Sequence, residues 1–248
     1  MSATLTPRER LIVALDVPDG VAALALLKRL AGEITTVKVG KQLFVAEGPA
    51  LVRKLIEAKL RVFLDLKFHD IPNTVAGATR EAVRLGAAFV DVHAAGGRAM
   101  MRAACEAAEE EAARRGVARP RLLGVTVLTS LDAAALQETG VSGSVEEQVV
   151  RLAVLAQQAG LDGVVASPRE IGAVRARCGR EFLVVTPGIR EAVAAPDDQR
   201  RTLTASEAIH AGADFLVVGR PVIGASDPGG AASKMAAQIG AALGSPTR

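Results

Sequence analysis

The sequence predicts a single domain built as a closed (β/α)8 TIM barrel, in which eight parallel strands each precede a helix. Three observations indicate this α/β fold class: the chain length, a series of short apolar runs, and the helix-like segments between them. The chain has 248 residues, which is the usual size of such a barrel. No stretch rich in Pro, Gly or Ser divides it, so we expect one domain over residues 1–248.

The predicted strands are short runs rich in Val, Leu and Ile that are almost continuously apolar. Such runs are typical of parallel strands that are buried on both faces. Eight units in succession favour a closed barrel over the main alternative, a doubly wound open sheet with extra elements. The runs occupy residues 11–15, 36–39, 61–64, 89–92, 122–127, 163–166, 182–185 and 215–218.

The segments between these runs have the periodicity of helices. Examples are residues 21–30, 51–58, 75–85, 99–115 and 146–159. Several helical segments end at a glycine, the residue favoured just past a helix C-terminus. These glycines are Gly32, Gly86, Gly116, Gly160, Gly179 and Gly212.

The composition argues against several functional classes. The net charge of +3 is small and spread along the chain, and there is no Trp or Tyr, so we expect no nucleic-acid partner. The polar N-terminus lacks the apolar core of a signal peptide. No apolar run reaches the ~18 residues that suggest a membrane span. We therefore expect a cytoplasmic protein with no membrane partner, in which Cys105 and Cys178 are reduced thiols.

Polar residues gather at the carboxyl ends of the predicted strands, where barrels of this kind carry their chemistry. They include Asp16, Lys38, segment 65–70, Asp91, His93, Thr126, Thr129, Ser130, segment 186–190 and segment 219–221.

The third strand carries the most informative cluster. Asp65 and Lys67 are two residues apart and should face the same side of the strand, within reach of Lys38 on the neighbouring strand. Two ammonium groups would hold a buried carboxylate ionised, and the carboxylate would hold them protonated. Such an array could deliver a proton and repel an anion placed against Asp65. The structural alternative is a salt-bridge network that only plugs the end of the barrel.

The end of the chain offers a candidate phosphate site and a candidate lid. Gly219 and Arg220 follow the eighth strand, where barrels of this kind often bind phosphate. The long irregular segment 188–202 is typical of a lid, with Arg190 and Gln199 facing the ligand. The alternatives are a surface arginine and a solvated charged loop.

We expect neither a metal nor a cofactor. His69 and His93 lie near the barrel mouth, but a metal site needs more converging ligands, and Lys38 and Lys67 would repel a cation there. The sequence has no Rossmann glycine fingerprint and no P-loop.

The segment 63–74, FLDLKFHDIPNT, resembles the signature D-x-K-x-x-D-I-P-x-T of the orotidine 5'-phosphate decarboxylase family. The D-x-K-x-x-D core is shared with relatives in the same superfamily, whereas the DIPNT extension is more specific. The resemblance covers nearly the whole chain. It continues in segments 14–16, 37–40, 125–130, 186–190, 197–199 and 218–221.

This resemblance implies a cofactor-free enzyme that converts orotidine 5'-monophosphate to UMP and CO2, the last step of de novo pyrimidine nucleotide biosynthesis. The implied catalytic residues form a Lys-Asp-Lys-Asp array of Lys38, Asp65, Lys67 and Asp70. Lys67 would be the general acid that protonates C6, and Asp65 would lie against the substrate carboxylate.

The resemblance also implies binding roles and a homodimer. Asp16 and Lys38 would hold the ribose hydroxyls, and Thr129 would hydrogen-bond the pyrimidine. Asp70 and Thr74 would reach the neighbouring subunit's active site. The implied phosphate ligands are Arg190, Gln199, Gly219 and Arg220.

Two other interpretations remain. A sister class with the same barrel acts on sugar phosphates with Mg²⁺, and it has a metal-binding Glu at the second-strand position where this chain has Lys38. An inactive barrel that serves as a binding module would be expected to have lost the charged residues, yet this chain retains them.

Overall fold

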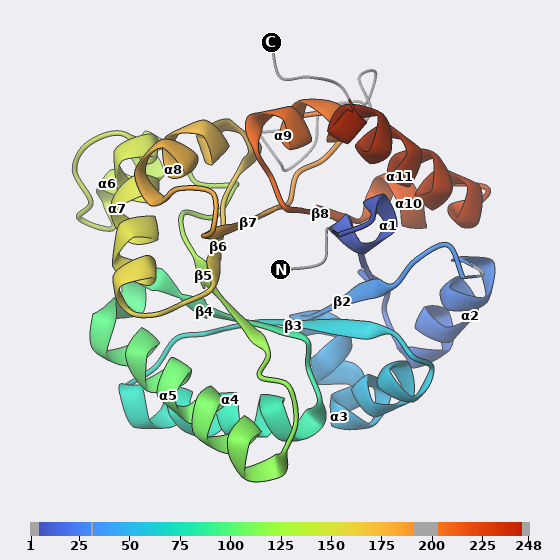
Figure 1. Cartoon of the computed structure of the whole chain (residues 1–248), viewed down its shortest axis with the longest axis horizontal. Coiled ribbons are helices and arrows are strands. Elements are labelled where there is room, and N and C mark those ends of the chain that lie inside the picture. Colours follow the sequence, from blue (N-terminus) through green and yellow to red (C-terminus); the bar gives the residue numbers. More distant parts are fainter. Residues whose placement is uncertain (1–4, 31, 191–202, 245–248) are drawn as a thin grey trace.

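The computed structural model describes residues 5–30, 32–190 and 203–244, and these form the predicted barrel (Figure 1). The strands are β1 (Leu11–Ala14), β2 (Thr36–Gly40), β3 (Arg61–Phe68), β4 (Phe89–His93), β5 (Arg121–Val125), β6 (Gly163–Val165), β7 (Leu183–Thr186) and β8 (Phe215–Val218). They are parallel and pair in sequential order, and β1 also pairs with β8 to close the barrel. The closed barrel is therefore confirmed, and the open-sheet alternative is wrong.

The helices form a ring outside the strands (Figure 1). They are α1 (Pro7–Arg10), α2 (Gly20–Leu30), α3 (Lys41–Glu57), α4 (Pro72–Leu85), α5 (Gly97–Arg115), α6 (Ala133–Glu138), α7 (Val145–Gln158), α8 (Ile171–Cys178), α9 (Ala205–Ala211), α10 (Arg220–Ile223) and α11 (Pro228–Gly244). Two short 3-10 helices, η1 (Ala94–Gly96) and η2 (Pro168–Glu170), follow β4 and β6.

Most helix boundaries agree with the sequence pattern, and α3 has an additional part that the pattern did not indicate. The predicted segment 51–58 matches the part of α3 after Gly48, whose backbone is non-helical, and the structure adds a helical part that begins at Lys41. Gly48 has a φ of 63° and precedes Pro49, and this pair resembles a helix break in the sequence. The expected glycine stops are confirmed at Gly86 and Gly212, which end α4 and α9 in the left-handed conformation.

A small apolar core fills the inside of the barrel. The rings of Phe89 and Phe215 meet edge to face with their centroids 5.2 Å apart, and Phe63 lies 6.0 Å from Phe89. All three side chains are fully buried. Phe63 precedes Asp65 by two residues on β3, so an apolar floor lies directly beneath the charged residues at the barrel mouth.

The opposite end of the barrel is held by two Arg–Asp pairs that also bind the backbone. Asp162, which precedes β6, accepts hydrogen bonds from Arg119 at 2.7 Å and from the Leu122 N–H at 2.6 Å. Asp214, which precedes β8, pairs with Arg175 and accepts the Val184 N–H at 2.8 Å. Each carboxylate thus ties an arginine to a neighbouring strand.

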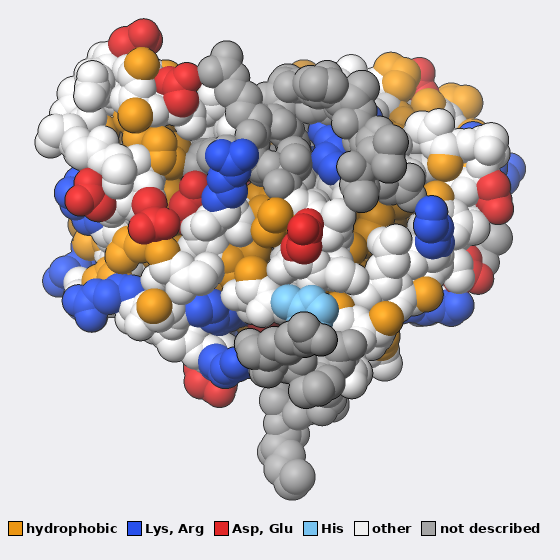
Figure 2. Space-filling view, turned by 90° about the horizontal axis from the view of Figure 1, so that it is seen from above, with side chains coloured by type: hydrophobic (Ala, Val, Ile, Leu, Met, Phe, Trp, Pro, Cys, Tyr) orange, Lys and Arg blue, Asp and Glu red, His pale blue; other side chains and the backbone are white. Residues whose placement is uncertain are grey.

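The described surface carries charges of both signs. On the face shown in Figure 2, basic and acidic side chains are interspersed with apolar ones. Within the described parts of the chain, no helix combines the length and apolarity needed to cross a bilayer. Cys105 and Cys178 are buried and form no disulfide.

Candidate active site

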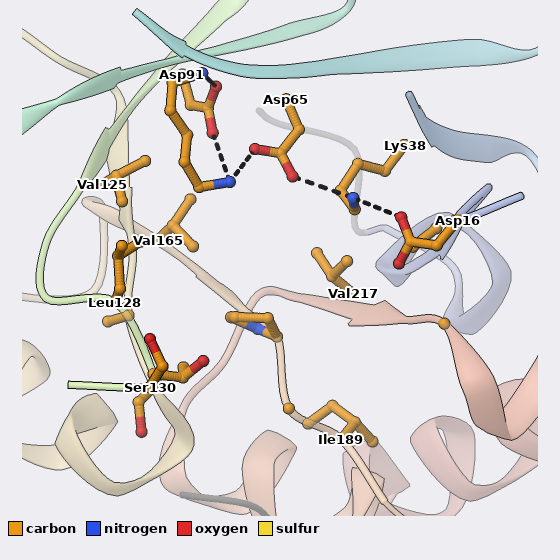
Figure 3. Close-up of a pocket in the computed structure, with 18 of the residues that line it drawn as sticks. Asp16, Lys38, Asp65, Asp91, Val125, Leu128, Ser130, Val165, Ile189 and Val217 are labelled. Atoms are coloured by element: carbon orange, nitrogen blue, oxygen red, sulfur yellow. Dashed lines mark hydrogen bonds and ion pairs between the residues drawn. The ribbon is translucent and has the colours of Figure 1, made fainter. Parts of the chain in front are cut away.

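A cavity of about 340 Å³ opens at the carboxyl ends of the strands, which is within the usual range for small-molecule sites. Figure 3 shows a row of charged side chains at one side of it, and apolar residues such as Val125, Val165 and Val217 together with Ser130 elsewhere in its lining. Most of the predicted site residues line this cavity. They are Asp16, Lys38, Asp65, Lys67, Thr129, Arg190, Gly219 and Arg220.

The charged side chains form a row across four adjacent strands. Lys38 Nζ lies 3.1 Å from Asp16 Oδ1 and 3.1 Å from Asp65 Oδ2. Lys67 contacts the other oxygen of Asp65, and its Nζ lies 4.0 Å from Asp91 Oδ2. Asp16, Lys38, Asp65 and Asp91 can be followed in this order along the dashed lines of Figure 3. The predicted proximity of Lys38, Asp65 and Lys67 is therefore confirmed.

Lys67 reaches this row through an irregular backbone. The pairing of β3 with β4 shifts register between Leu64 and Phe68, and Lys67 has a φ of 53°. Strand alternation alone predicted the contact between Asp65 and Lys67 correctly, but it does not account for the irregular backbone at Lys67. The side chain enters the cavity because a bulge and a left-handed residue re-aim it, as bulges near active sites commonly do.

The electrostatics of the row hold its central carboxylate ionised. Burial alone would raise the pKa of Asp65, but the charges of Lys38 and Lys67 and a hydrogen bond with Asp91 outweigh it and lower the pKa below its usual range. Burial alone would lower the pKa of Lys38, yet Asp65 and Asp16 raise it. At neutral pH the row therefore contains a carboxylate beside a protonated Lys38, as the sequence predicted.

Asp91 is a site residue for which the sequence suggested no role. It is 1% exposed, and its Oδ1 accepts the Lys67 N–H at 2.8 Å. Burial, followed by the charge of Asp65 and a hydrogen bond with it, raises the Asp91 pKa well above its usual range. An acidic residue within the apolar run FVDVH was the available signal, because such a group is rarely buried without a partner.

The candidate phosphate end lies across the cavity from β3 and β4. Gly219 and Arg220 follow β8, and Arg190 follows β7. A Cβ at Gly219 would lie 3.3 Å from Asp16 Oδ2, so a side chain there would crowd the cavity wall. Gln199 and most of the proposed lid fall outside the described residues.

Ser167 is a second cavity residue that the sequence-based prediction omitted. It follows β6, is 1% exposed and lines the cavity. Its position directly after a predicted strand was the signal that could have identified it.

Asp70 and Thr74 lie outside the cavity of their own chain. They belong to a run of exposed residues, 69–74, between β3 and the first turn of α4. Ile71 within it is 68% exposed.

His69 and His93 lie together near the barrel mouth, with ring centroids 5.3 Å apart. Burial, followed by the charges of His69 and Lys67, lowers the pKa of His93 to about 4. Among the described residues, no group of three or more His, Cys, Asp or Glu side chains is arranged to hold a metal.

A closed parallel barrel with a charged cavity at the carboxyl ends of its strands has the architecture of a TIM-barrel enzyme. The chain matches the orotidine 5'-phosphate decarboxylase / HUMPS family over residues 9–235 and belongs to that family. The resemblance carried by segment 63–74 is thereby confirmed.

Curated relatives and solved structures agree with this assignment. The orotidine 5'-phosphate decarboxylase of Syntrophotalea carbinolica is 55% identical over 95% of this chain and 97% of its own length. That of Moorella thermoacetica is 55% identical over 94% of this chain and 92% of its own length. The crystal structure of the Lactobacillus acidophilus enzyme has a TM-score of 0.84 at 36% identity, covering 93% of this chain and 99% of that one.

Proposed function

We propose that this chain decarboxylates orotidine 5'-monophosphate to UMP and CO2, the last step of de novo pyrimidine nucleotide biosynthesis. The observation that carries the proposal is the Lys38–Asp65–Lys67 row on the wall of the cavity. Relatives at 55% identity that are named for this activity support it.

Lys67 is the proposed general acid. Breaking the bond between C6 and the carboxylate releases CO2 and leaves an electron pair on C6. The Lys67 ammonium stabilises this charge as it develops and then transfers a proton to C6, so that a C–H bond forms and the lysine becomes a neutral amine. Solvent returns the proton after the product leaves.

Asp65 would face the substrate carboxylate in this mechanism. Its pKa is lowered by Lys38 and Lys67 against the effect of burial, so it is ionised when an anionic substrate arrives. The like charges repel each other, and loss of CO2 relieves that repulsion. Lys38 and Lys67 keep the free site from carrying an uncompensated buried charge.

The other cavity residues are proposed to bind the rest of the substrate. Asp16 and Lys38 would hold the ribose hydroxyls, and Thr129 would hydrogen-bond the pyrimidine. The phosphate ligands would be Arg190, Gln199, Gly219 and Arg220.

Asp70 and Thr74 are proposed to act in the neighbouring active site of a homodimer. Their exposure and the exposed Ile71 between them support this, because the segment does not line the cavity of its own chain and presents an apolar side chain at the surface. Mixing an inactive Lys67→Ala chain with an inactive Asp70→Ala chain should restore about a quarter of wild-type activity, since random pairing gives half heterodimers with one intact site each. No restoration in verified heterodimers would contradict the shared site.

The Mg²⁺-dependent sister class is the main competing activity. Lys38 stands where that class has a metal-binding Glu, and its ammonium is paired with Asp16 and Asp65. A cation placed among these groups would meet Lys38 and Lys67 at short range.

One assay separates the two activities. Purified protein is added to orotidine 5'-monophosphate in the presence of EDTA, and loss of the orotate chromophore is followed in the ultraviolet. Conversion to UMP without metal is expected. No conversion, with Mg²⁺-restored activity on a sugar phosphate, would assign the chain to the sister class.

A further inference from the structure

The side chain of Asp91 is fully buried, and the proposed mechanism assigns it no role. It lies on β4, beside the strand that carries Asp65 and Lys67, and its side chain is 0% exposed. Its Oδ1 accepts the backbone N–H of Lys67, and its Oδ2 lies on the side of the Lys67 ammonium. Burying a carboxyl costs free energy, so a buried carboxyl in a cavity wall is a candidate functional group.

The backbone of Lys67 needs an external restraint. With a φ of 53°, Lys67 occupies a region that lysine rarely adopts. The register shift between Leu64 and Phe68 interrupts the regular ladder with β4 at this point. The Asp91 side chain, rather than a β4 backbone carbonyl, accepts the Lys67 N–H at 2.8 Å.

The same carboxyl also faces the other end of Lys67. Asp91 Oδ2 lies 4.0 Å from Lys67 Nζ, and Asp65 contacts that ammonium from the adjacent strand. An ammonium has three N–H donors. Two carboxyls therefore flank the head group of Lys67 and leave a donor for the cavity.

We propose that Asp91 is a positioning residue that holds the backbone of Lys67 and flanks its ammonium, so that the transferred proton points at the carbon that loses CO2. The inference rests on the proposed function only in treating Lys67 as the proton donor. The restraint on Lys67 itself follows from the contacts of Asp91.

The charge states of Asp91 and Asp65 agree with a role for Asp91 in positioning Lys67 and for Asp65 in facing the substrate. Burial and the neighbouring Asp65 favour the protonated form of Asp91, whereas Lys38 and Lys67 favour the ionised form of Asp65. A neutral acid can accept the Lys67 N–H through its carbonyl oxygen. It does so without placing a second negative charge against an anionic substrate.

Two substitutions separate this role from a general effect on folding. Asp91→Asn keeps a carbonyl oxygen for the Lys67 N–H, whereas Asp91→Leu keeps a similar volume and removes the acceptor. We expect kcat on orotidine 5'-monophosphate to fall about 100-fold in Asp91→Leu and less than about tenfold in Asp91→Asn. Affinity for UMP should stay near wild type in both, because the proposed ribose and phosphate contacts lie elsewhere.

Amide hydrogen exchange at Lys67 provides a readout that does not depend on activity. The Lys67 N–H should be protected in wild type and in Asp91→Asn, and exposed to exchange in Asp91→Leu. Asp91→Ala, which adds no bulk, replaces Asp91→Leu in both measurements if thermal unfolding shows that the leucine variant does not fold.

The outcomes are distinct. Equal losses of kcat in Asp91→Asn and Asp91→Leu, or wild-type turnover in Asp91→Leu, would overturn the proposal. If the wild-type protein does not decarboxylate orotidine 5'-monophosphate, the proposed function fails and the exchange data decide alone. Lost protection in Asp91→Leu then supports the restraint on Lys67, and unchanged protection refutes it.

Discussion

The two ends of the barrel use the same kinds of charged residue in opposite ways. At the amino ends of the strands, Asp162 and Asp214 each bind an arginine and a backbone N–H. At the carboxyl ends, Asp65 is bound by the flexible side chains of two lysines. The carboxylates at the amino ends therefore hold neighbouring strands together. The second arrangement places ammonium donors in a cavity, where a ligand can use them.

The largest expected effect at the carboxyl end is on catalysis. Lys67→Ala should lower kcat/KM for orotidine 5'-monophosphate by at least about 10⁴-fold, because the proton donor and the charge that stabilises the transition state are both lost. Binding of UMP should be largely retained, as measured by calorimetry. Near-normal decarboxylation by this variant would refute the mechanism.

The barrel and most of the charged residues at its carboxyl end could be predicted from the sequence. The apolar runs gave the strand positions, and the barrel then required Asp16, Lys38 and Asp65 to converge at one end. The part of α3 from Lys41 to the kink at Gly48 was not predicted, and Gly48 and Pro49 separate it from the part that was.

Two other features of the site depend on tertiary structure. The left-handed conformation of Lys67 arises where β3 slips against β4, and no local pattern records that slip. The task inferred for Asp91 follows from its contact with Lys67 across the same pair of strands.

At the amino end we expect a change in stability instead. Asp214→Ala removes the partner of Arg175 and of the Val184 N–H, and it should lower the free energy of unfolding by about 3 kcal/mol. Denaturant unfolding monitored by circular dichroism would measure this loss. The kcat of the folded variant should be close to wild type, and a large drop in kcat with unchanged stability would break the contrast between the two ends.

The pH dependence of stability should also differ within the carboxyl end itself. The pKa of Asp91 is raised in the folded protein by burial and by Asp65, so the folded state retains a proton that the unfolded state releases. This group therefore destabilises the fold increasingly as pH rises from its unfolded pKa towards its folded pKa. The lowered pKa of Asp65 acts in the opposite sense, because its stabilisation is present above the unfolded pKa and is lost as pH falls.

Asp91→Asn isolates the first of these effects. Relative to wild type, the variant should gain stability as pH is raised from 5 to 8, as measured by denaturant unfolding at each pH. Asp162→Asn is a matched control at the other end of the barrel, where the carboxylate is bound by Arg119. A stability difference between Asp91→Asn and wild type that does not change with pH would show that Asp91 is ionised in the folded protein.

The smallest expected effect concerns two lysines, one at each end of β3. Among the described residues, Lys59 and Lys67 are the non-glycine residues with positive φ, at 66° and 53°. Lys59 is exposed, follows α3 and does not line the cavity. Lys59→Gly should therefore relieve strain and raise the free energy of unfolding by about 1 kcal/mol, with kcat unchanged. Strain at the amino end would then be dispensable, whereas at Lys67 the same conformation directs the proposed proton donor into the cavity. A loss of kcat in Lys59→Gly would show that the two ends are coupled through β3.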